Sequence, residues 1–372
     1  MDWHAALAWR VRRHGLDARA PADALLEVTG RIAGLHAQLM GSAELSLWAR
    51  LDAVTRETAG QALWEDRTLV KTWAMRGTLH LLPAAEYGVW QGALATYRHY
   101  LKPSWFKAFA ITPPQLEALL QAVAAELHGA LRTRAELAAA VERRTGAPGM
   151  GQKLLDGFGA YLKPASFRGL LCFGPGEGQN VRFTHPETWL GRRDPVGADE
   201  ALAAMARRFL GVYAPATRED LGRWWAVSPA QAGKLLRALG DEAAEVDVAG
   251  EPRWVPADQA AAMAAAQPTG TVRLLPAFDP YVIGATRHAE RLLDDPVLRA
   301  RVHRPQGWVS PVILVDGRIA GVWRHESKRS RVVVEAEPFG WLEASVREHV
   351  EEEAGRLAAF LDGALELRWT GR

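Results

Sequence analysis

A histidine and a glutamine separated by one alanine, His36-Ala37-Gln38, are residues whose types could activate water. A neutral imidazole can accept a proton or a hydrogen bond, and the carbonyl of a glutamine amide can accept a hydrogen bond. The pair could therefore position a water molecule, and the histidine would add general-base character and pH sensitivity. The residue types alone are equally typical of polar side chains at the edges of a buried helix.

The stretch around this pair has helical spacing. Apolar residues recur at intervals of three or four: Leu25, Val28, Ile32, Leu35 and Leu39. Such spacing predicts one buried helix face. If the helix continues through Gln38, the side chains of His36 and Gln38 lie about 200° apart, on either side of Ala37. Alternatively, Gly34 and Gly41 bend or end the helix, so that both side chains turn toward one point.

Other catalytic motifs are incomplete. The glycine-rich segment at 146–153 lacks the Gly-Lys-Ser/Thr ending of a phosphate loop, and the one at 174–180 lies where a hairpin turn is expected. The eleven histidines show no His-Glu-x-x-His, and Cys172 is the single cysteine. No Gly-x-Ser-x-Gly elbow occurs. We therefore expect no metal and no cofactor, with Cys172 as a buried, inert thiol.

Length and composition are those of a folded protein with more than one domain. The chain has 372 residues, of which 48% are hydrophobic and 24% charged. No apolar run is long enough to span a bilayer and no secretory signal is evident, so we expect a cytoplasmic protein. The net charge of +2 does not by itself indicate nucleic-acid binding. Basic residues nevertheless gather at 97–107 and 324–331, where they could meet DNA phosphates or form solvated surface.

A threonine followed by an arginine begins a helix-like stretch at three places: Thr55, Thr133 and Thr217. Glu136 and Asp220 follow the second and third threonine at the spacing of a capping box. Helical segments then lead to two short extended runs around a turn, at 70–82, 167–185 and 243–257. Helix, helix and hairpin, repeated at roughly eighty residues, predict three winged-helix modules.

The remainder, 270–340, is rich in strand signals and contains an Asp316-Gly317 hairpin turn. An amphipathic helix is predicted over 341–361 and would close the chain. We therefore expect an α+β protein, mainly α, with three tandem winged-helix modules, a C-terminal β-hairpin region and a closing helix.

Proline-containing polar segments at 112–115 and 192–199 indicate linkers between modules. The expected modules are 1–110, which carries His36-Ala37-Gln38, then 111–195, 196–268 and a β-rich region at 269–372.

Several segments resemble signature sequences of the AlkZ/YcaQ type of DNA glycosylase. They are GLHAQLMGSAELSLWARL (34–51), KTWAMRGTLH (71–80), GLLCFGPGEGQNVRFTH (169–185), TREDLGRWW (217–225), LLPAFDPYVIG (274–284) and VDGRIAGVWR (315–324). The resemblance covers nearly the whole chain. It implies a C-shaped array of three winged-helix modules around a DNA-binding cleft. It also implies hydrolysis of the N-glycosidic bond of alkylated purines, especially N7-alkylguanine, in alkylation repair or in bacterial self-protection against DNA-alkylating antibiotics.

The catalytic motif of that family is Gln-x-Gln or Gln-x-Asp, and His36-Ala37-Gln38 occupies the corresponding position. The resemblance therefore implies that Gln38 orients water or stabilises charge on the sugar, whereas His36 departs from the pattern. An N7-alkylated guanine is already a cationic leaving group, so water attack suffices without a lysine Schiff base or a metal. Asp279 is a further candidate for electrostatic support, or it caps a turn.

Candidates for DNA contacts lie at the expected hairpin turns and should mostly meet phosphates. They are Arg76, Gln179, Asn180, Arg182, Lys328, Arg329 and Arg331. Trp105 could stack on a base or pack in a core. The expected partner is double-stranded DNA with an alkylated guanine, bound by a monomer without membrane contact. Two alternatives remain open: a non-catalytic winged-helix regulator or damage-binding protein, and a protein that sequesters the toxin itself.

Overall fold

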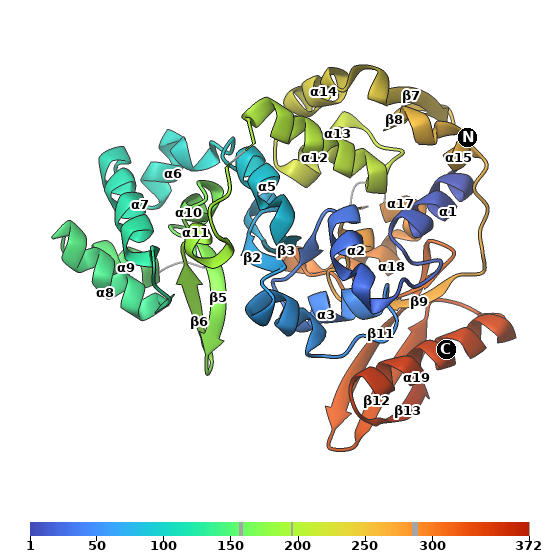
Figure 1. Cartoon of the computed structure of the whole chain (residues 1–372). Helices are drawn as coiled ribbons and strands as arrows, with labels where there is room; N and C mark the ends of the chain where they lie inside the picture. The colour runs from blue at the N-terminus through green and yellow to red at the C-terminus, as the bar shows by residue number, and fades with distance from the viewer. Residues whose placement is uncertain (156–158, 195, 285–288, 372) are drawn as a thin grey trace. The chain divides into compact units, whose positions relative to one another are not determined.

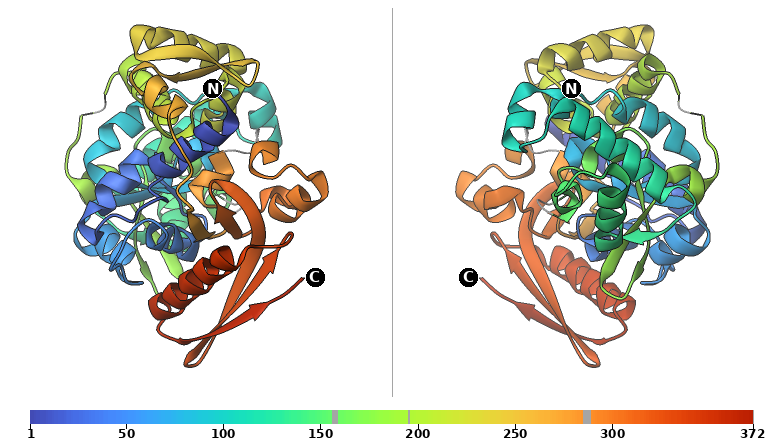
Figure 2. Two further views of the ribbon diagram at one scale, coloured as in Figure 1. Left: turned by 90° about the vertical axis from the view of Figure 1, so that its right-hand side faces the viewer. Right: turned by 90° about the vertical axis from the view of Figure 1, so that its left-hand side faces the viewer.

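The computed structural model describes residues 1–155, 159–194, 196–284 and 289–371. The chain forms two compact units, one from residues 1–59 and 206–372 and the other from residues 60–205. Short helices and small sheets make up both units, which confirms the predicted α+β class (Figures 1 and 2). The module boundaries predicted from the sequence are finer than this division and remain predictions.

The first unit is assembled from two segments that are far apart in the sequence. Its N-terminal segment contains α1 (Trp3–Arg13), α2 (Leu25–Arg31), β1 (Leu35–His36) and α3 (Met40–Trp48). After the boundary within α12 (Ala198–Tyr213), its second segment contains α13 (Arg218–Trp225), α14 (Pro229–Ala238), β7 (Ala243–Val248), β8 (Glu251–Pro256), α15 (Ala260–Ala264), β9 (Val272–Leu275), α16 (Pro280–Gly284), α17 (Ala289–Leu292), α18 (Pro296–Val302), β10 (Val312–Val315), β11 (Arg318–Lys328), β12 (Arg331–Pro338), α19 (Ala344–Phe360) and β13 (Ala364–Trp369).

A five-stranded sheet with the order β13-β12-β11-β10-β9 forms the C-terminal part of this unit. Helix α19 lies along the sheet and buries Val350, Ala354 and Leu357, as its spacing predicted (Figure 2). The helix does not close the chain, because β13 follows it and pairs in parallel with β12. A parallel pair needs a crossover connection, and α19 supplies it.

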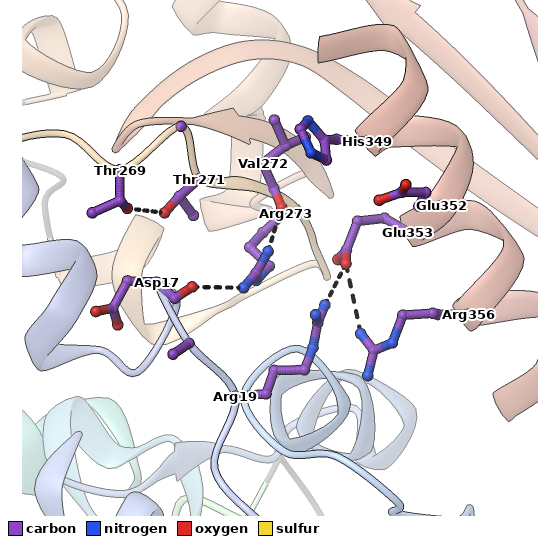
Figure 3. A pocket seen from close by; sticks show the side chains of 12 residues that line it. Asp17, Arg19, Thr269, Thr271, Val272, Arg273, His349, Glu352, Glu353 and Arg356 are labelled. Atoms are coloured by element: carbon purple, nitrogen blue, oxygen red, sulfur yellow. Dashed lines mark hydrogen bonds and ion pairs between the residues drawn. The ribbon is translucent and has the colours of Figure 1, made fainter. Parts of the chain in front are cut away.

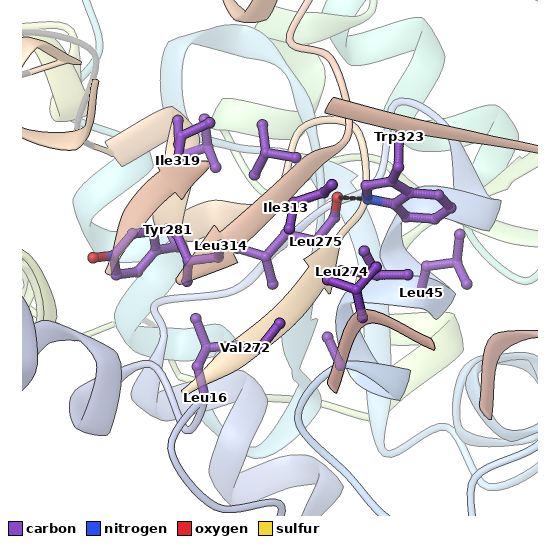
Figure 4. Close-up of a cluster of buried hydrophobic side chains, with 14 of the residues drawn as sticks. Leu16, Leu45, Val272, Leu274, Leu275, Tyr281, Ile313, Leu314, Ile319 and Trp323 are labelled. Carbon is purple, nitrogen blue, oxygen red and sulfur yellow. Dashed lines mark hydrogen bonds between the residues drawn. The ribbon is translucent and has the colours of Figure 1, made fainter. Parts of the chain in front are cut away.

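The main core of the first unit joins its two segments (Figure 4). Leu274 of β9 and Ile313 of β10 are fully buried beside Leu45 of α3. Trp323 of β11 is buried there too, and its indole Nε1 donates a hydrogen bond to the Leu275 carbonyl at 2.9 Å. Burial of these apolar side chains therefore holds the N-terminal segment onto the sheet.

The second unit contains two hairpins surrounded by helices. Its elements are α4 (Thr58–Gly60, which begins in the first unit), β2 (Leu69–Trp73), β3 (Leu79–Pro83), α5 (Tyr87–Leu94), α6 (Pro103–Ala108), α7 (Pro113–Leu127), β4 (Arg132–Thr133), α8 (Arg134–Thr145), α9 (Met150–Leu155), α10 (Lys163–Phe167), β5 (Cys172–Glu177), β6 (Asn180–Thr184) and α11 (Pro186–Leu190). Trp73 of β2 packs its ring 4.9 Å from Phe173 of β5 and 6.1 Å from Phe183 of β6. The two hairpins thus share one aromatic core.

The three predicted hairpins are β2–β3, β5–β6 and β7–β8. At the second and third hairpins, the backbone just before a helix pairs with the hairpin. Arg132 of β4 pairs with Phe183, and Ala216 forms an isolated bridge with Trp254. A strand that joins the wing in this way is typical of winged helices.

The threonines that start these helices act as the sequence predicted. The Glu136 amide donates to the Thr133 hydroxyl at 3.3 Å, and the Thr133 amide donates to the Glu136 carboxylate at 2.8 Å. Thr217 and Asp220 make the same reciprocal pair. After Thr55 the helix begins only at Thr58.

The linker predicted at 112–115 is wrong. This segment begins α7, because Thr112 and Gln115 form a capping box and the two prolines occupy the first helical positions.

Candidate active site

His36 belongs to the short strand β1 and Gln38 to the bend that follows it, so a helix through Gln38 is ruled out. Helix α2 ends at Arg31, and Ala33 and Gly34 then take left-handed backbone conformations with φ of 60° and 89°. Of the two glycines considered for this stretch, Gly34 lies in the left-handed turn that follows the helix, whereas Gly41 lies inside α3 and ends no helix.

Of the four residues 35–38, the first three are buried and only Gln38 is exposed. Leu35 and Ala37 are completely buried, whereas Gln38 is exposed and His36 is 7% exposed. Successive side chains of a strand point to opposite faces, so His36 points away from Leu35 within β1. The packing of Leu35 and Ala37 holds the segment in the core.

An aromatic stack adjoins the His36 imidazole. The ring of Phe278 lies nearly parallel to it, with centroids 5.0 Å apart and planes inclined by 22°. Trp308 meets the Phe278 ring edge-on, again with centroids 5.0 Å apart. Phe278 has a left-handed backbone with φ of 60°, an uncommon conformation for a residue with a side chain. The chain thus accepts local strain where Phe278 meets His36.

Asp279, the next residue, is completely buried in an ion pair. Both its carboxylate oxygens accept hydrogen bonds from the Arg50 guanidinium, at 2.7 and 2.8 Å. Its Oδ1 also accepts from the Tyr281 amide at 2.9 Å, which caps the start of α16. The capping role considered for Asp279 is therefore present, and its electrostatic role in catalysis stays a prediction. Because Asp279 anchors the turn that carries Phe278, it can act as a positioning residue.

The ion pair continues to a buried histidine. The Arg50 Nε donates to the His14 carbonyl at 2.8 Å, and the His14 ring lies between Tyr213 and Tyr281, 5.2 and 5.0 Å away. Burial, and next the positive charge of Arg50, hold the pKa of His14 well below its ordinary value. This environment favours the neutral form of the His14 imidazole.

The C-terminal DNA-contact candidates gather at the tip of the β11–β12 hairpin. Lys328, Arg329 and Arg331 are all exposed, and they flank a turn where Arg329 has φ of 51°. Lys328 pairs with Glu326 at 2.8 Å and Arg331 with Glu366 at 3.3 Å. Arg329 has no ion pair with the residues that the structure describes.

The other DNA-contact candidates belong to the second unit. Gln179 and Asn180 are exposed at the β5–β6 turn, whereas the Arg182 Nε donates to the Pro175 carbonyl at 2.8 Å within the same hairpin. Arg76 is half-buried between β2 and β3. The ring of Trp105 is partly buried and lies 4.6 Å from the ring of Phe109, and stacking on a base stays a prediction.

A pocket of about 420 Å³ in the first unit contains none of the predicted catalytic residues (Figure 3). Glu353 of α19 points between Arg19 and Arg356 and forms ion pairs with both. Arg356 also contacts Asp52, with Nη2 and Oδ1 3.1 Å apart. The ion pairs of Glu353 with Arg19 and of Arg356 with Asp52 join α19 to the N-terminal segment.

Cys172 is buried as predicted, and burial raises the pKa of its thiol. Across residues 1–155, 159–194, 196–284 and 289–371, no group of three or more His, Cys, Asp or Glu side chains could hold a metal ion. No helix within these ranges is long and apolar enough to cross a membrane.

Comparison with known proteins decides the family. The model of the family described as "DNA glycosylase AlkZ-like" matches residues 29–360, a range that includes His36, Phe278 and Trp308. The chain belongs to this family. It is therefore a DNA glycosylase, an enzyme that acts on DNA and hydrolyses N-glycosyl bonds.

Similar proteins match over almost the full length. An interstrand DNA cross-link repair glycosylase of Streptomyces sahachiroi is 38% identical over 365 residues, 96% of each chain. The solved structure of the Streptomyces sahachiroi DNA glycosylase AlkZ matches with a TM-score of 0.89 and 36% identity, covering 100% of both chains. This likeness confirms the predicted winged-helix type of fold.

Three residues that build the candidate site were not singled out from the sequence. Phe278 stacks on His36, Trp308 contacts Phe278 edge-on, and Arg50 holds Asp279. Arg50 lies within the WAR segment that carries the resemblance, and Phe278 precedes Asp279, so proximity in sequence was the available signal. Nothing in the sequence marked Trp308.

Proposed function

We propose that this DNA glycosylase, acting as a monomer, releases N7-alkylguanine from double-stranded DNA, including bulky adducts and interstrand cross-links. The observation that carries the proposal is the stack of the His36 ring on Phe278, with exposed Gln38 two residues further along the chain and buried Leu35 and Ala37 holding the segment in the core. The Streptomyces sahachiroi relative, whose name refers to interstrand cross-link repair, supports cross-linked DNA as a substrate.

The chemistry requires little beyond a held water and a polar surface. Alkylation at N7 makes guanine cationic, so the base departs as a neutral molecule when the bond from its nitrogen to the sugar breaks. In the proposed mechanism, the neutral imidazole of His36 accepts a hydrogen bond from the attacking water and can take its proton. The Gln38 carbonyl dipole faces the sugar, where positive charge develops in the transition state.

Contacts to the DNA backbone are proposed for the exposed hairpin turns. The tip of β11–β12 carries Lys328, Arg329 and Arg331, and the β5–β6 turn carries Gln179 and Asn180. An enzyme that recognises a lesion has little need to read base sequence, so these residues would hold phosphates. Removal of such adducts would serve alkylation repair or self-protection against DNA-alkylating compounds.

The test is base release under single-turnover conditions from two duplexes. One duplex contains N7-methylguanine, and the other carries a cross-link between guanine N7 atoms of the two strands. His36→Ala and Gln38→Ala are compared with the matched controls His4→Ala and Gln121→Ala, which alter exposed residues of α1 and α7.

We expect base release by the wild type and by both controls, and a rate at least roughly 100-fold lower for Gln38→Ala. Each variant is first shown to be folded and to bind DNA. Tight binding of both duplexes without base release by the wild type would refute the proposed substrate. Release that persists in Gln38→Ala would remove this residue from the catalytic group.

A further inference from the structure

Trp308 is the outermost ring in a series of aromatic contacts that runs from His36 through Phe278. Trp308 is 41% exposed, and its ring centroid lies 5.0 Å from that of Phe278. The Phe278 ring in turn lies 5.0 Å from His36. A partly exposed indole therefore lies two ring contacts away from the imidazole assigned to water activation.

The turn that carries Trp308 is closed by backbone hydrogen bonds. The Arg304 amide donates to the Trp308 carbonyl at 2.8 Å, and His303 forms an antiparallel bridge with Val309. Gln306 and Gly307 take left-handed conformations, with φ of 62° and 77°. Such a closed turn holds the indole in place, so little side-chain freedom is lost when a planar group stacks on it.

We propose that the exposed face of Trp308 stacks on the cationic N7-alkylpurine whose glycosidic bond is cleaved. This inference rests on the proposed function and adds a way in which the enzyme selects the charged base. Indole is the best aromatic partner for a cation, and its face is electron-rich. A neutral guanine has the same shape but lacks the charge, so Trp308 would favour the alkylated base.

Residue Arg304, at the other end of the turn, supports a nucleic-acid ligand. Its side chain is exposed, and it forms no ion pair within the part of the chain that the structure describes. A guanidinium beside an aromatic face suits a nucleotide, because the ring meets the base while the charge meets a phosphate.

Measurements of binding to uncleavable DNA test this inference separately from catalysis. The first probe is a duplex with 2′-fluoro-N7-methyl-deoxyguanosine, which is cationic and resists cleavage. The second contains 7-methyl-7-deazaguanine, which has the same shape without the charge. Affinities are measured by fluorescence anisotropy for the wild type, Trp308→Ala, Trp308→Phe and the control Trp341→Ala, which removes a tryptophan that is 85% exposed.

We expect the wild type and Trp341→Ala to bind the cationic duplex roughly 10- to 100-fold more tightly than the neutral one. Trp308→Ala should lose this preference while its affinity for the neutral duplex changes little, and Trp308→Phe should retain part of it. Thermal unfolding verifies that each variant is folded.

Two results would overturn the inference. One is equal affinity of the wild type for the cationic and neutral duplexes, and the other is full preference in Trp308→Ala. If the wild type releases no base yet shows a preference that depends on Trp308, the proposed function fails and the stacking site stands. If the wild type releases base but shows no such preference, the proposed function stands and the stacking site fails.

Discussion

His36 combines a hydrogen-bond acceptor with an aromatic ring, and a glutamine supplies only the first. The inclination of 22° between the rings of His36 and Phe278 shows that the imidazole uses its face for packing. The nitrogen atoms lie in the plane of the ring, so the stack helps to set the direction in which they can meet water. A planar side chain at this position therefore acts in both packing and chemistry.

Replacement of His36 by glutamine separates these two contributions. His36→Gln keeps an acceptor but loses the stack, so we expect base release roughly 10-fold slower than in the wild type. His36→Ala loses both and should be at least roughly 100-fold slower. Single-turnover release of N7-methylguanine measures the difference. Equal rates for wild type and His36→Ala would show that the imidazole takes no part.

We expect removal of the Asp279 carboxylate to act mainly by lowering the free energy of unfolding, not by a direct effect on the rate of base release. Asp279→Ala leaves the Arg50 charge buried without its partner, which costs about 3 to 5 kcal/mol. Urea denaturation gives the change in free energy of unfolding, and Glu242→Ala, which breaks an exposed pair with Arg207, serves as the control without measurable effect. A variant of wild-type stability that releases base slowly would instead assign Asp279 a direct catalytic role.

The residues of the motif could be predicted from the sequence, but their conformation could not. The apolar spacing from Leu25 to Val28 does belong to a helix, and the same spacing continues by coincidence through Leu35. The left-handed turn at Ala33 that breaks the helix depends on tertiary packing, because alanine has no preference for that conformation. The stack of Phe278 on His36 joins residues 242 positions apart, which no local pattern reveals.

At the scale of the elements, the β11–β12 hairpin extends from the core into solvent and has charged side chains at its exposed end. Trp323 is buried near one end of β11, and from Arg324 to Lys328 every residue is exposed. The pairing between Arg324 and Glu335 and between Lys328 and Arg331 keeps this exposed end in register. The hairpin therefore presents its tip at a fixed direction from the sheet.

Within the tip, Arg329 should contribute most to DNA affinity. Lys328 and Arg331 each have an acidic neighbour, whereas Arg329 has none among the described residues. We expect Arg329→Ala to reduce the slope of log affinity against log salt concentration by about 1. Arg331→Ala should reduce it less, because Glu366 already offsets that charge. A salt titration of binding to undamaged duplex makes the comparison, and identical slopes for all three proteins would contradict it.

Local elements were predictable because their signals are local. The capping boxes at Thr133 and Thr217 and the Asp316-Gly317 turn each depend on residues within a few positions of one another. Strand β13 was not predicted, because its partner β12 lies across the whole of α19 and parallel pairing leaves no turn signal.

For the whole molecule, several histidines that lose part of their hydration in the folded state link stability to pH. Burial lowers the pKa of His14, His99, His185, His303 and His325. The unfolded chain takes up protons at these positions below about pH 6.5, while the folded chain does so only at lower pH. The protons therefore favour the unfolded state, and stability is present above pH 6.5 and is lost on acidification.

His14 should be the clearest contributor, because it is fully buried beside Arg50. We expect the free energy of unfolding to fall between pH 7.5 and 5.5, with His14 contributing up to about 1.4 kcal/mol per pH unit below pH 6.5. His14→Phe keeps an aromatic ring between the two tyrosines and should make the dependence shallower, whereas the exposed His4→Phe should not. Urea denaturation at both pH values provides the test. A pH dependence of the free energy of unfolding that is unchanged in His14→Phe would contradict the prediction.

The two-segment construction of the first unit also bears on how the enzyme tolerates a broken backbone. A single proteolytic cut at the exposed Gly178-Gln179 turn would place His36 on one fragment and Phe278 and Trp308 on the other. The core between α3 and the C-terminal sheet would still join the fragments. Nicked protein should therefore migrate as two bands in a denaturing gel and elute as one species in buffer, with the aromatic stack beside His36 intact.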